Sequence, residues 1–158
     1  MEKFDVRITK LEPMRIICFN GYGQEPEKQS FNKLLAWAKA KGLMDDGQPH
    51  RFFGYNNPNP SEGTPNYGYD TWISVDESVQ PEGEARLIKF SGGLYAVTRC
   101  EVRDPYGDIP GTWHKLVTWM ENSRYHHGNH QWLEEHLSLP GQGLDGGFIL
   151  DLYLPIAE

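Results

Sequence analysis

The chain has 158 residues and a formal net charge of −7, with 38% hydrophobic and 13% aromatic residues. This length suits one ordinary domain, or two small modules that share a core. Lysine and arginine never form a run longer than two, so the sequence lacks the basic cluster that neutralises nucleic-acid phosphates, and we expect no direct nucleic-acid binding.

Hydrophobic spacing and turn residues predict the elements of the first half. The apolar run Ile16–Phe19 is typical of a buried strand, and Gly21-Tyr22-Gly23 is expected to end it. Pro26 suits the first turn of a helix because its φ is already helical, and Gly42 suits the end of that helix. The predicted elements are strands at 6–11 and 15–19, a helix between 26 and 42, and strands at 51–55 and 69–75.

The second half repeats this order. The segment 76–83 is the predicted connection, and Ser91-Gly92-Gly93 is a predicted turn between two strands. Polar, Gly/Pro-rich loops are expected at 56–66 and 138–146. The predicted elements are strands at 85–90 and 94–102, a helix that follows Ile109-Pro110-Gly111 and ends near Ser123, and strands at 131–137 and 147–156. The expected fold class is α+β with antiparallel sheets.

A repeated motif supports a duplication of the chain. Phe31-Asn32-Lys33-Leu34-Leu35-Ala36-Trp37 returns 82 positions later as Trp113-His114-Lys115-Leu116-Val117-Thr118-Trp119, and Asp70–Ile73 corresponds to Asp151–Leu154. An apolar rhythm shared by any two α+β halves is the alternative, but it does not require the Lys and Trp matches. We predict one domain over 1–158, made of two strand–strand–helix–strand–strand modules at about 1–80 and about 81–158. They would be related by a pseudo-two-fold axis, with a central ligand pocket.

The termini and cysteines bear on the compartment. Met1–Asp5 lacks the basic and apolar regions of a secretory signal, and no apolar run approaches the ~20 residues of a membrane helix. Cys18 and Cys100 each lie in an apolar, strand-like run, so we expect buried free thiols, with a disulfide between them as the alternative. We therefore expect a cytoplasmic protein that does not bind membranes.

Several short motifs, taken in order, resemble the GyrI-like small-molecule-binding family, also called the AraC-type effector-binding fold. They are Phe90–Val97, Trp113–Leu116, Tyr69-Asp70, Leu133–Leu137 and Leu150–Ile156. The resemblance covers nearly the whole chain. It implies a bacterial domain similar to the ligand-sensing domains of multidrug-responsive transcription activators and to free-standing gyrase-inhibitor-like proteins.

The resemblance also implies a ligand-binding glutamate before the final loop, in the pattern apolar, Glu, aliphatic, aromatic. Leu133-Glu134 fills the first two places, whereas Glu135 and His136 depart from the last two. Glu134 is therefore the predicted pocket residue, and Glu135 is the alternative. Strand alternation independently places Glu134 and His136 on one face. A carboxylate among aromatic rings loses solvation and attracts a cation, although a solvated strand with two acids is the alternative reading.

Aromatic side chains from both halves complete the predicted site. Phe53 and Tyr55 would be the counterparts of Glu134 and His136 at an offset of 81. Rings around a carboxylate suit a lipophilic cation, although each ring alone is more often part of a core. The predicted ligand-binding residues are Glu134, His136, Tyr69, Trp72, Phe53, Tyr55, Tyr67, Phe19, Tyr22 and Tyr106.

We expect a stand-alone effector-binding domain for a small lipophilic molecule, cationic or aromatic, without a cofactor. A protein partner such as a regulator or gyrase would carry any signal. The resemblance leaves two alternatives open: a hydrolase of cyclopropane-containing electrophiles with Glu134 as base, and a gyrase inhibitor. No metal is expected, because the histidines of His126–His130 lie in a loop-like segment. Gly141–Gly146 lacks the strand–helix frame of a phosphate loop.

Overall fold

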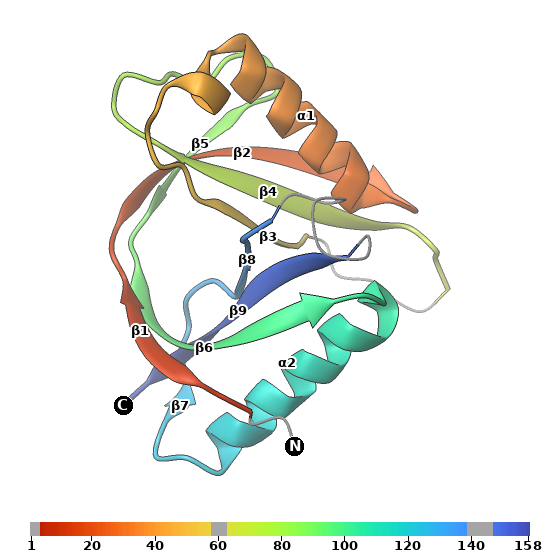
Figure 1. Cartoon of the computed structure of the whole chain (residues 1–158), viewed down its shortest axis with the longest axis vertical. Helices are drawn as coiled ribbons and strands as arrows, with labels where there is room; N and C mark the ends of the chain where they lie inside the picture. The colour runs from red at the N-terminus through yellow and green to blue at the C-terminus, as the bar shows by residue number, and fades with distance from the viewer. Residues whose placement is uncertain (1–3, 58–62, 139–146) are drawn as a thin grey trace. The chain divides into compact units, whose positions relative to one another are not determined.

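The structure is a computed structural model that describes residues 4–57, 63–138 and 147–158; the side chains of 105 and 106 lie outside this description. The chain divides into two compact units (Figure 1). Unit 1 contains Met1–Glu12 and Gly92–Glu158, and unit 2 contains Pro13–Ser91. No helix in the described ranges has the length and apolar character needed to cross a membrane.

Unit 2 is an antiparallel sheet covered on one face by a helix. Its strands are β2 (Met14–Gly23), β3 (Phe52–Asn56), β4 (Tyr67–Val75) and β5 (Arg86–Phe90), in the order β3-β4-β2-β5. Helix α1 (Pro26–Ala40) lies along β2 and β4 (Figure 1), and a short 3-10 helix, η1 (Leu43–Asp45), follows it. Leu34 and Ala38 of α1 are fully buried against Ile17 and Ile73 of the sheet, as helical spacing predicts.

The two faces of this sheet have different compositions. Ile17 and Ile73 are register partners and point toward α1, so the neighbouring pair Cys18 and Trp72 points to the opposite face. We call this opposite side the face away from α1. The side chains placed on it by strand register include those of Cys18, Asn20, Phe53, Tyr55, Asp70, Trp72 and Arg86.

Unit 1 is also an antiparallel sheet with a helix packed on one face. Its strands are β1 (Arg7–Leu11), β6 (Gly93–Val102), β8 (Leu133–His136) and β9 (Phe148–Ala157), in the order β1-β6-β9-β8, and the short strand β7 (His126–His127) also pairs with β9. Helix α2 (Pro105–Glu121) begins earlier than predicted, because it contains Ile109-Pro110-Gly111, which were expected to precede it. Leu116 and Met120 of this helix pack against Leu152 and Leu154 of the sheet.

The α+β class with antiparallel strands and two α-helices is confirmed. The units are not divided at residue 80, because β1 pairs with β6 and β5 pairs with β2. The pseudo-two-fold modules and their pocket stay predictions. The expected break at Gly21–Gly23 is wrong, because β2 continues to Gly23. A Cβ atom at Gly21 would lie 2.3 Å from the carbonyl oxygen of Pro26, so glycine here permits close approach of the strand to α1.

Strand register shows which positions of the two units correspond. In β4 and β9, Asp70 and Asp151 are 81 positions apart, and they lie opposite Tyr55 of β3 and Glu135 of β8 respectively. Tyr55 therefore corresponds to Glu135, at a shift of 80. The predicted correspondence of Tyr55 with His136 at a shift of 81 is wrong by one residue, because chain lengths between strands differ between the two halves.

Candidate functional site

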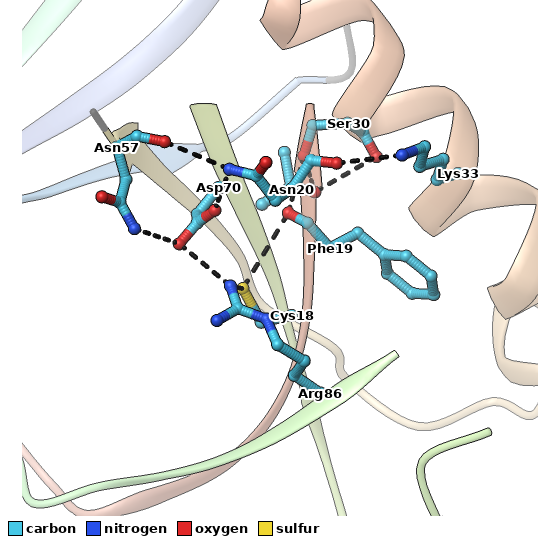
Figure 2. Close-up of polar contacts among 9 residues, drawn as sticks. Cys18, Phe19, Asn20, Ser30, Lys33, Asn57, Asp70 and Arg86 are labelled. Atoms are coloured by element: carbon cyan, nitrogen blue, oxygen red, sulfur yellow. Dashed lines mark hydrogen bonds and ion pairs between the residues drawn. The ribbon is translucent and has the colours of Figure 1, made fainter. Parts of the chain in front are cut away.

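A buried carboxylate on the face away from α1 collects donors from three parts of unit 2 (Figure 2). Asp70 is 1% exposed. Asn20 Nδ2 donates to its Oδ1 at 2.7 Å, while Asn57 Nδ2 and Arg86 Nη2 donate to its Oδ2 at 3.1 and 3.2 Å. A charged partner and two amide donors satisfy the hydrogen-bonding capacity of a carboxylate that has lost its water. Its role is to hold these side chains in place.

Cys18 lies beside this carboxylate and is chemically quiet. Arg86 Nη2 is 3.2 Å from Cys18 Sγ. Burial, with the negative charge of Asp70, raises the pKa of the Cys18 thiol to about 12. Because the thiolate is the nucleophilic form of cysteine, Cys18 is not a nucleophile at neutral pH. Both cysteines are free thiols, as expected.

Three of the predicted aromatic residues come together beside Asp70. The Trp72 ring meets Phe53 and Tyr55 edge-on, with ring centroids 6.4 and 5.3 Å apart, and Phe90 packs against it at 5.4 Å. Burial and the charge of Asp70 raise the pKa of Tyr55, so its hydroxyl stays protonated. The cluster is therefore an apolar surface with one polar group, the Tyr55 hydroxyl.

The other predicted aromatic residues lie elsewhere. Phe19 packs against Trp37 of α1 with ring centroids 5.9 Å apart, and the Tyr67 hydroxyl donates to Glu27 of α1. Tyr69 shares this side of the sheet, because a Cβ atom at Gly54 would meet its ring. Tyr22 is 54% exposed near the end of β2. The side chain of Tyr106 lies outside the described residues. The predicted aromatic residues that belong to unit 2 are therefore divided between the two faces of its sheet.

Unit 1 contains a second buried carboxylate at the corresponding position. Asp151 accepts hydrogen bonds from Arg99 Nε at 2.8 Å and from Arg7 Nη2. Its register partner Glu135 is 7% exposed and accepts a hydrogen bond from the Tyr153 hydroxyl at 2.7 Å. Two carboxylates and two guanidinium groups thus form a charge-balanced cluster on the face of the unit 1 sheet that points away from α2. In the sequence, the repeat that aligns Asp70 with Asp151 pointed to this second carboxylate. The arginine partners of Asp151 come from other strands, β1 and β6, so the repeat did not reveal them.

Glu134 points to the opposite side of the same sheet, where it meets α2. It lies opposite Leu152, a residue of the core under α2. Trp113 Nε1, from α2, donates to Glu134 Oε2 at 3.2 Å. The ring of Trp132 lies 5.3 Å from that of Trp113, and Trp132 is 40% exposed. The partly exposed carboxylate of Glu134 therefore lies beside two indole rings. The sequence analysis did not predict that Trp113 and Trp132 lie near Glu134.

His136 shares this face with Glu134, as strand alternation predicted. Desolvation lowers the pKa of His136 to about 3. Its ring is therefore neutral at physiological pH and adds no positive charge near Glu134. Within the ranges that the structure describes, no three His, Cys, Asp or Glu side chains gather as metal ligands.

The sequence model of the GyrI-like small molecule binding domain matches residues 4–157, so the chain belongs to this family. No curated protein sequence gives a significant match.

Solved structures of low sequence identity share the fold. EcmrR in its DNA complex within EcmrR-RPo has a TM-score of 0.71 at 12% identity, covering 98% of this chain and 58% of that chain. The present chain therefore spans 58% of the EcmrR length. A hydrolase from Listeria innocua has a TM-score of 0.66 at 13% identity, covering 96% of this chain and 91% of the hydrolase. SAV2435 bound to tetraphenylphosphonium has a TM-score of 0.57 at 10% identity, covering 97% of this chain and 94% of SAV2435.

Proposed function

We propose that this GyrI-like chain binds a small lipophilic cation, and that Glu134 binds it together with Trp113 and Trp132. The observation that carries the proposal is the hydrogen bond from Trp113 Nε1 to Glu134 Oε2, with the second indole packed against the first. The fold shared with SAV2435, solved with the lipophilic cation tetraphenylphosphonium, supports this ligand class.

The chemistry of the cluster suits such a ligand. Indole faces attract cations through the ring quadrupole and offer large apolar contact area. The Glu134 carboxylate is partly shielded from water, so its attraction to a cation is stronger than that of a fully solvated acid. The exposed part of Trp132 makes the cluster reachable from solvent. The neutral ring of His136 does not oppose a positive ligand.

Glu135 is the matched comparison for Glu134, because it is the adjacent carboxylate and faces the other way. Its negative charge belongs to the cluster that Arg7, Arg99 and Asp151 complete. Removing that charge would leave an excess positive charge on that face. We therefore assign Glu135 to the stability of unit 1 rather than to the ligand.

Tetraphenylphosphonium and tetraphenylborate test the proposal, because they have nearly the same shape and opposite charge. We expect calorimetric titration of the unchanged chain to show tighter binding of the cation. Glu134→Gln should weaken the cation by about tenfold and leave the anion nearly unchanged. Glu135→Gln should keep the preference for the cation. Equal affinity for the two ions in the unchanged chain, or equal losses in the two variants, would refute the role of Glu134.

A second candidate is hydrolysis of a cyclopropane-containing electrophile, with Glu134 as general base. It is favoured by the shared fold with the Listeria innocua hydrolase and by a carboxylate held by a neutral indole donor. Incubation with such a compound should give the product of water addition, detected by mass spectrometry, and Glu134→Gln should abolish it. Turnover equal to that in buffer would exclude this candidate and leave ligand binding unaffected.

A further inference from the structure

Unit 2 contains an anchored and half-exposed arginine that the proposed cation site does not use. The Arg86 side chain is 55% exposed, whereas that of its partner Asp70 is 1% exposed. A single nitrogen, Nη2, contacts both Asp70 Oδ2 and Cys18 Sγ (Figure 2). Within the described part of the chain, Nε and Nη1 have no hydrogen-bond acceptor. One end of the guanidinium group is therefore anchored, and its other N–H groups face solvent.

The anchor itself is held from several directions. Figure 2 shows Asn57 and Arg86 approaching Asp70 from opposite sides, while Asn20 donates to the other carboxylate oxygen. The Asn20 amide also donates to the carbonyl oxygen of Asn57 at 3.1 Å. Because Asp70 is buried and bonded on both oxygens, it keeps the guanidinium group in one orientation. A pre-oriented arginine loses less side-chain entropy when it binds a ligand.

Apolar side chains share this face of the sheet with Arg86. On the face away from α1, Arg86 and Cys18 are register partners, and Cys18 lies opposite Trp72. Ile88, half-buried, follows Arg86 on the same face of β5. A guanidinium N–H group that is not already bonded donates a charge-assisted hydrogen bond to a carboxylate. The half-buried Ile88 on the same face favours a carboxylate attached to an apolar ring.

The corresponding position in unit 1 is less suited to an anion. Arg7 takes the place of Arg86 there, and Glu135 takes the place of Tyr55. Glu135 adds a second buried carboxylate beside Asp151, and this charge repels a nearby anion. In unit 2 the other side chains that donate to Asp70 are neutral amides. We propose that unit 2 binds a small aromatic carboxylate through Arg86, at a site separate from Glu134.

The test compares 1-naphthoate with neutral 1-naphthamide by calorimetry. We expect naphthoate to bind the unchanged chain more tightly, and Arg86→Gln to weaken it by about tenfold, the loss of one charge-assisted contact. Arg86→Lys should recover only part of the affinity, because an ammonium group keeps the positive charge but not the planar group that Asp70 holds in one orientation. Arg124→Gln removes an exposed arginine of unit 1 and should have no effect. Glu134→Gln should also leave naphthoate binding unchanged, which separates this site from the proposed function.

A measurement on the unchanged chain covers the case in which Arg86→Gln fails to fold. The Nε–H signal of Arg86 in a ¹H–¹⁵N spectrum, assigned by its loss in Arg86→Lys, should shift on addition of naphthoate and stay in place with naphthamide. A static signal overturns the proposal. So does naphthoate binding that Arg86→Gln leaves intact, or that Arg124→Gln weakens to the same degree.

Discussion

His136 makes the stability of the fold depend on pH, and one substitution isolates the effect. Desolvation lowers the pKa of this ring to about 3 in the native state, whereas a histidine in an unfolded chain titrates near about 6.5. Between these values the unfolded chain binds a proton that the native state does not bind. The free energy of unfolding therefore decreases as pH falls below about 6.5, and the loss levels off below about pH 3.

The two pKa values give the size of the effect. At pH 8 both states are neutral at this residue, so His136 contributes no difference. At pH 5 the unfolded histidine is almost fully protonated, and its preference for the unfolded state costs about 2 kcal/mol of stability. The cost reaches about 5 kcal/mol only when pH falls below the native pKa. The interval from pH 8 to pH 5 is therefore the practical window.

Urea unfolding, followed by circular dichroism at several pH values, measures this loss. The unchanged chain should lose about 2 kcal/mol more between pH 8 and pH 5 than His136→Gln does. Any direct effect of the substitution on packing cancels, because only the change with pH is compared. His126→Gln, at an exposed histidine, should follow the unchanged chain. If His136→Gln has the same pH dependence as the unchanged chain, the desolvated neutral ring is refuted.

Three further substitutions test the packing. Gly54→Ala should destabilise the fold by about 1–3 kcal/mol in urea unfolding, because the new Cβ atom would lie 2.3 Å from the Tyr69 hydroxyl oxygen. Gly111→Ala in α2 meets nothing within 4 Å and should instead stabilise by about 0.5–1 kcal/mol; destabilisation there would contradict the helix geometry. Asp151→Asn should cost about 3 kcal/mol, because it leaves Arg7 and Arg99 without their buried anion; an unchanged urea midpoint would show the cluster to be dispensable.

Local spacing was enough to predict most elements. Leu34 and Ala38 lie on the buried side of α1, and Glu134 and His136 share one face of β8, because helix and strand periods act over a few residues. The start of α2 at Pro105 was missed, since Pro110 and Gly111 suggested a later beginning.

Contacts between segments that are distant in the sequence could not be predicted from local spacing. The pairing of β1 with β6 and of β5 with β2 depends on which edges are free after the chain has folded. The same holds for the site. The binding role of Glu134 stays a prediction from its motif. Its Trp113 partner was not predicted, because it comes from a helix, and helix-to-strand contacts leave no fixed spacing in the sequence. The Asp70–Arg86 pair was missed for the same reason.

The discontinuous composition of unit 1 has a consequence for biosynthesis. A chain leaves the ribosome with its N-terminus first, and every residue of unit 2 is present once Ser91 has emerged. Unit 2 can therefore complete its hydrogen-bond ladders while translation continues. Strand β1 is made before unit 2 but has no β6 to pair with until Gly93–Val102 has followed, so its edge stays unpaired while unit 2 is being made.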